Sequence, residues 1–292
     1  MLPAMVLCAG FGTRLRPITE VVPKPLLPVG DRPAIAHTLD RLRDAGFGPV
    51  AMNTHHRAES FDGALPADVR ISHEVEILGT AGGVRHAAGA MGEGDVLVWN
   101  GDVLAEPDLH RLVRVHGESA KGIATLLAVR RSRGEGTLGL DPTGGVVRLR
   151  GELFGNEVMG ADFLGIQVLR EATREVLPQQ GCLVGDVYLP ALRRGERVEV
   201  CLHEGEWDDI GTPHALLRAN VRWLRRMGID CWVSGDAVIG GGVELADSVV
   251  CPGASVAGRG AVARCLVLAG ATATAPLADA VVMADGRIIA AG

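Results

Sequence analysis

A short apolar run near the start of the chain breaks into a glycine-rich loop, and this junction constrains the fold more than any other feature. Met5–Cys8 has the composition of a buried strand, and the loop AGFGTR (residues 9–14) follows it at once. A strand that opens into small residues lets backbone N–H groups approach phosphate oxygens closely. Arg14 and Lys24, which lies between two prolines, supply the positive charge that a triphosphate needs. The stretch therefore predicts a nucleotide-binding loop.

The spacing within the loop excludes two common phosphate-binding motifs. GxxxxGK[ST] is absent because no lysine follows Gly12 at the required place, and GxGxxG fails because Leu15 stands where the third glycine belongs. The string is instead GxGTRLxPxT followed by PKP, over residues 10–25.

Strand-like and helical patterns alternate through the first half of the chain. Further β-rich runs are found at Val50–Asn53, Val69–Ser72, Val96–Asn100 and Ile123–Val129. Helices are predicted between them, at Thr80–Met91, at Asp108–His116 and after Asp31-Arg32-Pro33, which would form a cap and first turn of a helix that Gly46 ends. This alternation predicts an α/β fold with a mixed, mostly parallel sheet and helices on both faces, whose ligands bind where the strands end.

The middle of the chain, residues 130–212, is less regular and contains two further strand-like runs, Phe163–Val168 and Val198–Cys201. Pro213–Met227 has the apolar stripe of an amphipathic helix. We take this helix as the end of a first domain, residues 1–228.

Beyond Gly228 small and aliphatic residues recur at a period of six, as in Val243, Val249, Ser255, Ala261, Val267 and Ala273. A six-residue period with glycines at the corners resembles the hexapeptide left-handed β-helix, here with about three coils. An irregular stack of Val- and Gly-rich hairpins is the alternative. Residues 229–292, the tail, are thus predicted to form a short β-helix.

The composition is that of a globular protein with no general affinity for nucleic acid. Hydrophobic residues make up 47% of the chain, charged residues 22%, and the net charge is −6. No apolar run reaches the ~18 residues that span a bilayer, and the chain begins with a strand and loop, so neither a membrane partner nor a signal peptide is expected. The six cysteines are dispersed without a CxxC pair, which predicts reduced thiols in a cytoplasmic protein.

Four separated motifs in residues 3–227 resemble those of the sugar-1-phosphate nucleotidylyltransferases, also called nucleotide-sugar pyrophosphorylases. The layout is similar to mannose-1-phosphate guanylyltransferases, and the N-terminal half also to N-acetylmuramate-1-phosphate uridylyltransferases. The resemblance implies a Rossmann-like domain that transfers a nucleotidyl group from a nucleoside triphosphate to a sugar-1-phosphate and releases pyrophosphate. It further implies that Arg14 steadies the departing phosphates and that Lys24 holds phosphate near the reacting centre.

Two carboxylates are the candidate ligands of a Mg²⁺ ion. Asp102 follows the apolar run Val96–Val98 beside a glycine, where a carboxylate suits Mg²⁺ over phosphate, although a helix-capping Asp is the alternative. Asp209 lies in WDDIGTP (residues 207–213), which resembles the second metal-binding segment of the family. Asp208 is expected to be a surface neighbour. The pair His55-His56 has no Cys or carboxylate near in sequence, so metal binding is not expected there.

Nucleotide binding is predicted along the loop and in HEVEILGTAGG (residues 73–83), which resembles the base-binding segment of the family. A carboxylate only accepts hydrogen bonds, and guanine offers two neighbouring donors where uracil offers one. Glu74 therefore favours GTP without excluding UTP, and a solvated carboxylate at a strand end is the alternative interpretation of this residue. The predicted nucleotide-binding residues are Leu7, Ala9, Gly10, Gly12, Thr13, Glu74, Gly79 and Thr80.

The sugar pocket departs from the family pattern. The family carries a Glu-Lys-Pro segment whose lysine binds the sugar phosphate, whereas this chain has VRLRGE at residues 147–152. Arg150 is the candidate substitute, although arginine and lysine differ in geometry. Gly139 and Gly165 resemble backbone positions that line the sugar.

Two other functions compete with the enzyme. Non-catalytic subunits of this kind typically lose the loop arginine, the lysine or a metal aspartate, and this chain keeps Arg14, Lys24, Asp102 and Asp209. An acyltransferase tail would need a histidine in its repeat, and none follows His214. A short open β-helix leaves edges that a second copy can cover, so a homo-oligomer is a further hypothesis.

Overall fold

The computed structural model describes residues 2–119 and 121–291, and the chain packs as two compact units. The first unit contains the residues up to Gly10 together with Thr38–Trp207, and the second contains Phe11–His37 together with the chain from Asp208 onward. α1 (Ala34–Asp44) and β14 (Trp207–Asp209) lie at the points where the chain passes from one unit to the other. The division into domains 1–228 and 229–292 stays a prediction.

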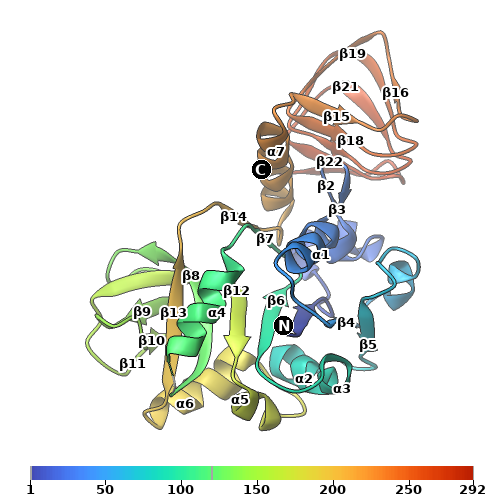
Figure 1. The fold of residues 1–292 in the computed structure, drawn as a ribbon. Coiled ribbons are helices and arrows are strands. Elements are labelled where there is room, and N and C mark those ends of the chain that lie inside the picture. Colours follow the sequence, from blue (N-terminus) through green and yellow to red (C-terminus); the bar gives the residue numbers. More distant parts are fainter. Residues whose placement is uncertain (1, 120, 292) are drawn as a thin grey trace. The chain divides into compact units, whose positions relative to one another are not determined.

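The first unit is built on a 10-stranded sheet, shown mainly in blue, green and yellow in Figure 1. The strands follow the order β11-β10-β9-β12-β6-β1-β4-β5, and β8 pairs with β12 and β13. Their bounds are β1 (Ala4–Leu7), β4 (Val50–Thr54), β5 (Arg70–His73), β6 (Val96–Asn100), β8 (Gly122–Arg131), β9 (Leu138–Leu140), β10 (Val146–Leu149), β11 (Glu152–Leu153), β12 (Met159–Leu169) and β13 (Arg197–His203). The short strand β7 (Val103–Ala105) follows β6 along the chain.

The sheet is mixed, as predicted, but it is not mostly parallel. The parallel pairs are β6 with β1, β1 with β4, β4 with β5, and β13 with β8. β12 pairs antiparallel with β6, β8 and β9, and β9, β10 and β11 continue antiparallel. Tight turns such as Asp141–Gly145 connect strands of this second half, and such short connections produce antiparallel pairs.

Short helices pack along the sheet of the first unit. They are η4 (Ala58–Phe61), α2 (Gly79–His86), α3 (Ala88–Met91), α4 (Leu109–Glu118), α5 (Glu171–Glu175), η5 (Leu183–Tyr188, a π-helix) and α6 (Leu189–Arg193). The single helix expected at Thr80–Met91 is two helices, because the backbone leaves helical geometry at Ala87 (φ −81°, ψ 1°). Asp108 caps α4 by accepting a hydrogen bond from the backbone N–H of Arg111 at 2.8 Å.

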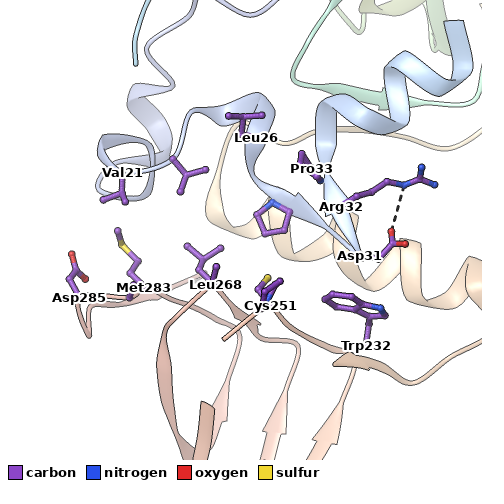
Figure 2. A pocket seen from close by; sticks show the side chains of 16 residues that line it. Val21, Leu26, Asp31, Arg32, Pro33, Trp232, Cys251, Leu268, Met283 and Asp285 are labelled. Atoms are coloured by element: carbon purple, nitrogen blue, oxygen red, sulfur yellow. Dashed lines mark ion pairs between the residues drawn. The ribbon is translucent and has the colours of Figure 1, made fainter. Parts of the chain in front are cut away.

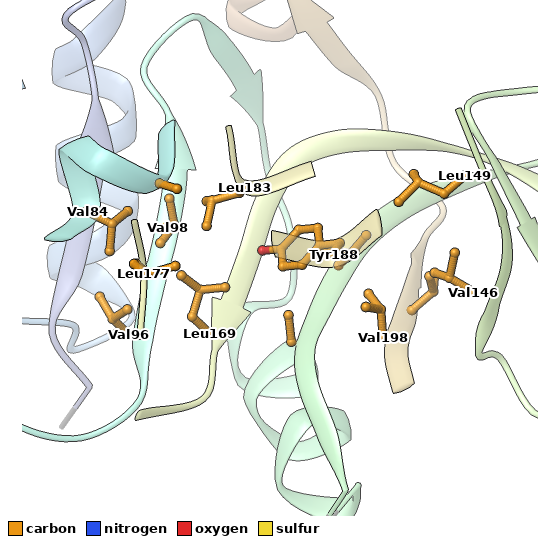
Figure 3. Close-up of a cluster of buried hydrophobic side chains, with 14 of the residues drawn as sticks. Val84, Val96, Val98, Val146, Leu149, Leu169, Leu177, Leu183, Tyr188 and Val198 are labelled. Atoms are coloured by element: carbon orange, nitrogen blue, oxygen red, sulfur yellow. The ribbon is translucent and has the colours of Figure 1, made fainter. Parts of the chain in front are cut away.

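The core of the first unit joins the sheet to these helices (Figure 3). Val98 and Leu169 from β6 and β12 pack with Val84 of α2 and with Tyr188. The Tyr188 hydroxyl is buried and donates a hydrogen bond to Gln167 Oε1 at 2.6 Å, which satisfies both polar groups inside the core.

The second unit holds the segment Phe11–His37, which begins within the glycine loop, and the long helix α7 (Pro213–Met227). The segment contains η1 (Thr13–Leu15), η2 (Ile18–Glu20), η3 (Lys24–Leu26) and the hairpin of β2 (Pro28–Val29) and β3 (Arg32–Pro33). The predicted bounds of α7 are confirmed: the Thr212 side chain caps its start, and Gly228 ends it in the left-handed conformation.

The hairpin is seated on α7. Asn220 Oδ1 accepts a hydrogen bond from the Gly30 N–H at 2.9 Å, and Asn220 Nδ2 donates to the Pro28 carbonyl at 3.1 Å. A Cβ on Gly30 would lie 2.2 Å from the Trp223 ring, so only glycine permits this approach.

The tail consists of stacked, mostly parallel strands. One stack is β15 (Cys231–Val233), β18 (Ser248–Val250), β20 (Leu266–Val267), β22 (Ala280–Val282) and the antiparallel β23 (Ile288–Ala290), and the other is β16 (Val238–Ile239), β17 (Gly242–Ala246), β19 (Ser255–Ala263) and β21 (Thr272–Ala278). Stacked partners such as Ser255 and Thr272 are 17 residues apart, close to three hexapeptides. Valines and alanines such as Val250, Val256 and Val262 fill the interior.

Candidate functional site

Arg14, Lys24 and Asp209 meet in the second unit, although Asp209 is 195 and 185 residues away from the two cations in sequence. Arg14 Nη2 lies 3.5 Å from Asp209 Oδ2, and Lys24 Nζ lies 3.4 Å from Asp209 Oδ1. A Cβ on Gly211 would lie 2.5 Å from Arg14 Nη2, so the glycine of the DIGTP motif makes room for the guanidinium. Two separate sequence motifs thus form one charged cluster.

The two cations differ in burial. The Lys24 side chain is 10% exposed, whereas that of Arg14 is 64% exposed and that of Asp209 is 39% exposed. η3 carries Lys24 and holds it between the two prolines, and its closing hydrogen bond runs from the Leu27 N–H to the Lys24 carbonyl. Lys24 is therefore a fixed charge, while Arg14 can reach into solvent.

Asp208 is not the surface neighbour that the sequence predicted. Its side chain is buried and pairs with Arg218 Nε at 2.8 Å and with Arg222 Nη1 at 2.6 Å, both on α7. Neighbouring residues on a strand point to opposite sides, so Asp208 faces α7 while Asp209 faces Arg14 and Lys24. Asp208 anchors the strand that presents Asp209.

Asp102 belongs to the first unit and follows β6, as expected. A Cβ on Gly101 would lie 2.4 Å from Cys8 Sγ, so the turn that carries Asp102 packs directly on the start of the glycine loop. Burial, and after it the charge of Asp102, raises the pKa of the Cys8 thiol well above its ordinary value. Cys8 is thus a protonated packing group.

The glycine loop crosses from the first unit into the second along the chain. Leu7, Ala9 and Gly10 lie in the first unit, and Gly12 and Thr13 in the second. Gly12 has φ 61°, and its carbonyl accepts a hydrogen bond from the Thr19 hydroxyl at 2.9 Å. The left-handed backbone explains the glycine at this position.

Glu74 is not a solvated carboxylate. Its side chain is buried, Oε1 accepts from Asn53 Nδ2 at 2.6 Å, and Oε2 accepts from the Leu78 N–H at 2.9 Å. The His55 ring contacts the Glu74 carbonyl at 2.9 Å. The predicted contact between Glu74 and the base stays a prediction.

Gly79 and Thr80 start α2 and hold the chain near Gly181. Gly79 has φ 73°, and a Cβ there would lie 2.4 Å from the Gly181 carbonyl oxygen. The Thr80 hydroxyl accepts from the Leu183 N–H at 2.8 Å. The structure thus gives both residues a packing reason, and their role toward a nucleotide stays a prediction.

The three predicted sugar residues lie on the antiparallel half of the first unit or beside it. Gly165 has φ 78°, and a Cβ there would lie 2.4 Å from Asn100 Nδ2 at the end of β6. A Cβ on Gly139 would meet the Glu157 carboxylate at 2.5 Å. The Arg150 guanidinium lies 3.7 Å from Sγ of Cys182, the residue that precedes η5.

Sequence reasoning missed a clamp on the loop that precedes Gly139. Arg148 is paired with Glu157 at 2.8 Å and donates to the backbone carbonyls of Glu135, Gly136 and Leu138. The Arg148 guanidinium lowers the pKa of the Glu157 carboxyl below its ordinary value. An arginine and a glutamate nine residues apart gave no local signal for this clamp.

The second unit also contains a cavity of about 400 Å³ (Figure 2). Leu26, Leu268, Met283 and Trp232 contribute to its apolar lining, and its charged lining residues are Asp31, Arg32 and Asp285. Two carboxylates against one guanidinium do not suit a triphosphate. The cavity is distinct from the charged cluster, because neither Arg14 nor Lys24 is among the residues that line it.

Within residues 2–119 and 121–291, no three His, Cys, Asp or Glu side chains gather as a metal-binding group. In the same described part of the chain, no helix is both long and apolar enough to cross a membrane.

The α/β fold, the glycine loop and the charged cluster are the features expected of a nucleotide-transferring enzyme, and comparison with known proteins assigns the chain to this class. A model of the nucleotidyl transferase family matches residues 3–226, and the chain belongs to this family. Together with the names of its curated relatives, this match confirms an enzyme of the sugar-1-phosphate nucleotidylyltransferase type.

Two curated relatives are similar over most of the chain. A mannose-1-phosphate guanylyltransferase of Mycobacterium tuberculosis is 30% identical over 88% of this chain and 75% of its own length. An N-acetylmuramate alpha-1-phosphate uridylyltransferase of Neisseria meningitidis is 33% identical over 72% of this chain and 93% of its own length. A crystal structure of HddC from Yersinia pseudotuberculosis, complexed with GMP-PN, has a TM-score of 0.63 at 22% identity and covers 76% of this chain and 100% of its own, which supports the fold.

Proposed function

We propose that the enzyme transfers a guanylyl group from GTP to mannose-1-phosphate or a similar sugar phosphate, with Mg²⁺ as its cofactor. The observation that carries this proposal is the convergence of Arg14 and Lys24 on Asp209, since it unites the two cations and one carboxylate that such a transfer needs. The choice of GTP and mannose-1-phosphate is supported by the similarity to the mycobacterial guanylyltransferase.

The reaction is an in-line displacement at the α-phosphorus. An oxygen of the sugar phosphate bonds to this phosphorus while the bond to the bridging oxygen of the β-phosphate breaks, and pyrophosphate leaves with that electron pair. The attacking phosphate is already an anion, so no general base is needed. The barrier lies in bringing two polyanions together and stabilising the charge of the transition state. Arg14 takes the departing phosphates, and Lys24 holds phosphate at the reacting centre.

Asp102 and Asp209 are the residues that would hold Mg²⁺. Mg²⁺ in nucleotide sites is usually bound by one or two carboxylates together with substrate phosphates and water, and two aspartates offer this donor set. Asp209 already pairs with two cationic side chains, which fits a carboxylate that would also bind a metal cation. When bound, the metal neutralises phosphate charge.

A second candidate is transfer of a uridylyl group from UTP to N-acetylmuramate-1-phosphate. The similarity to the meningococcal enzyme, which extends over 93% of that protein, favours it.

We further propose that the tail is a left-handed β-helix and that two copies of the chain associate through it. We also propose that the enzyme acts in the cytoplasm, and the free thiols of all six cysteines support this location. A monomer by light scattering would remove the association.

The test is a matrix of nucleoside triphosphates against sugar-1-phosphates, measured by pyrophosphate release with Mg²⁺ and with EDTA. We expect the highest kcat/KM for GTP with mannose-1-phosphate and loss of activity in EDTA. A preference for UTP with N-acetylmuramate-1-phosphate would select the second candidate. Absence of pyrophosphate release from every pair would contradict both.

A further inference from the structure

A chain of buried hydrogen bonds joins the loops at the ends of three neighbouring strands. β1, β4 and β5 lie side by side and parallel, so the residues that follow them meet at one edge of the sheet. The Cys8 N–H donates to Asn53 Oδ1 at 2.7 Å, and Asn53 Nδ2 donates to Glu74 Oε1. Glu74 Oε2 then accepts from the Leu78 N–H. The chain runs from the glycine loop to the residue that precedes α2.

The direction of each bond in this chain is fixed by chemistry. The Cys8 N–H can only donate, so the oxygen of the Asn53 amide must face it. The amide NH₂ of Asn53 must then face the Glu74 carboxylate, which can only accept. No other orientation satisfies all three groups, and an unpaired polar group at this depth is costly.

The packing around the pair is equally specific. Asn53 and Glu74 are 3% and 1% exposed. α2 passes over them at Gly83, where a Cβ would lie 2.7 Å from Asn53 Nδ2 and 2.8 Å from Glu74 Oε1. With both carboxylate oxygens engaged and the side chain enclosed, Glu74 presents almost no surface to a base.

We propose that Asn53 and Glu74 are positioning residues that fix the distance between the phosphate-binding loop and the turn at Leu78–Gly79, and that Glu74 influences base preference through this chain of hydrogen bonds rather than by contact with the base. The inference rests on the proposed nucleotide site. A nucleotide spans both segments, so their separation must match its length, and a displacement of about 1 Å can lower the rate by about 100-fold.

The test exploits the polarity of the chain. In the double variant Asn53→Asp with Glu74→Gln, the new carboxylate at position 53 would accept from both the Cys8 N–H and the new amide at position 74. The oxygen of that amide would accept from the Leu78 N–H. All three hydrogen bonds are restored with reversed polarity between the two side chains, and the carboxylate moves away from position 74. The single variants Asn53→Leu and Glu74→Gln each lose at least one bond.

We expect Asn53→Leu and Glu74→Gln each to raise the KM for the nucleoside triphosphate and to lower kcat/KM by about 10- to 100-fold. The double variant should recover kcat/KM to within about 3-fold of wild type. The ratio of its kcat/KM values for GTP and UTP should equal that of wild type. Thr54→Val is the matched control, because the neighbouring Thr54 hydroxyl is buried and, among the described residues, has no hydrogen-bond partner.

Two results would overturn the inference. The first is a double variant that melts like wild type yet stays as impaired as Glu74→Gln, which would assign the carboxylate to substrate contact. The second is an Asn53→Leu variant with the wild-type KM for the nucleoside triphosphate and the wild-type preference for GTP over UTP, which would show that the chain of hydrogen bonds only stabilises the fold. An inactive wild-type enzyme would instead contradict the proposed function.

Discussion

Replacing Lys24 with methionine should separate the proposed catalytic role of this cation from its structural role. Lys24 Nζ lies 3.4 Å from Asp209 Oδ1, and two unit charges at that distance attract by about 5 kcal/mol at an effective dielectric constant of about 20. Burying an ammonium costs several kcal/mol in the opposite direction. Asp209 is 39% exposed and keeps Arg14 when the lysine is removed, so Asp209 itself is not left both buried and alone.

We therefore expect Lys24→Met to change the free energy of unfolding by no more than about 1 kcal/mol, because the attraction and the desolvation nearly cancel. Methionine also preserves the apolar stem within its pocket. Turnover should fall about 100- to 1,000-fold, as when one positioned electrostatic group is lost from a transition state. Pyrophosphate release measures the first-order rate at saturating substrates, and urea unfolding measures the stability.

Arg287→Ala is the matched control. It removes an exposed cation of the same unit, paired with Asp285 and 3.8 Å from Glu20, without touching Asp209. Both turnover and stability should stay near wild type. The reasoning fails if Lys24→Met keeps turnover within about 3-fold of wild type, or if it loses several kcal/mol of stability, since the loss of activity would then follow from unfolding.

Three further substitutions test the structure elsewhere. Gly165→Ala should destabilise the first unit by about 1–3 kcal/mol in urea unfolding, because φ is 78° and the new Cβ would lie 2.4 Å from Asn100 Nδ2. Arg148 holds the pKa of the Glu157 carboxyl below its ordinary value of 4.5, so the pair stabilises the fold above that pH and loses this contribution as the pH falls through the pKa of the folded state. The difference in free energy of unfolding between wild type and Arg148→Met should therefore become smaller in acid. Gly30→Ala should lower the melting temperature, measured by circular dichroism, because its Cβ would meet a tryptophan ring of α7 at 2.2 Å.

The elements with strong local signals were predicted almost to the residue. α7 has an N-cap threonine, a proline in its first turn and a glycine at its end, and each of these acts within the helix itself. β6 is a continuous apolar run and needs no partner to be recognised. The direction of β12 was not predictable in the same way, because its pairing with β6, β8 and β9 depends on residues far away in sequence.

The same contrast holds in the site. Arg14, Lys24 and Asp209 could be singled out from the sequence because the charge of each side chain already indicates what it can bind. Asn53 was taken only as the last residue of a strand, since its importance comes from the loops on either side of that strand. Asp208 was misjudged because the arginines that bury it, Arg218 and Arg222, lie a helical turn apart on α7, a signal that is visible only once the helix is assigned.

The seating of the β2–β3 hairpin on α7 has a consequence for biosynthesis. The segment that carries Arg14 and Lys24 leaves the ribosome before Asp209 and Asn220, which are made nearly two hundred residues later. At about 5–20 residues per second, this segment waits roughly 10–40 s for its packing partners. The strands of the large sheet are therefore all synthesised before Asp209 can pair with Arg14 and Lys24, so this charged cluster is completed at a late step of folding during translation.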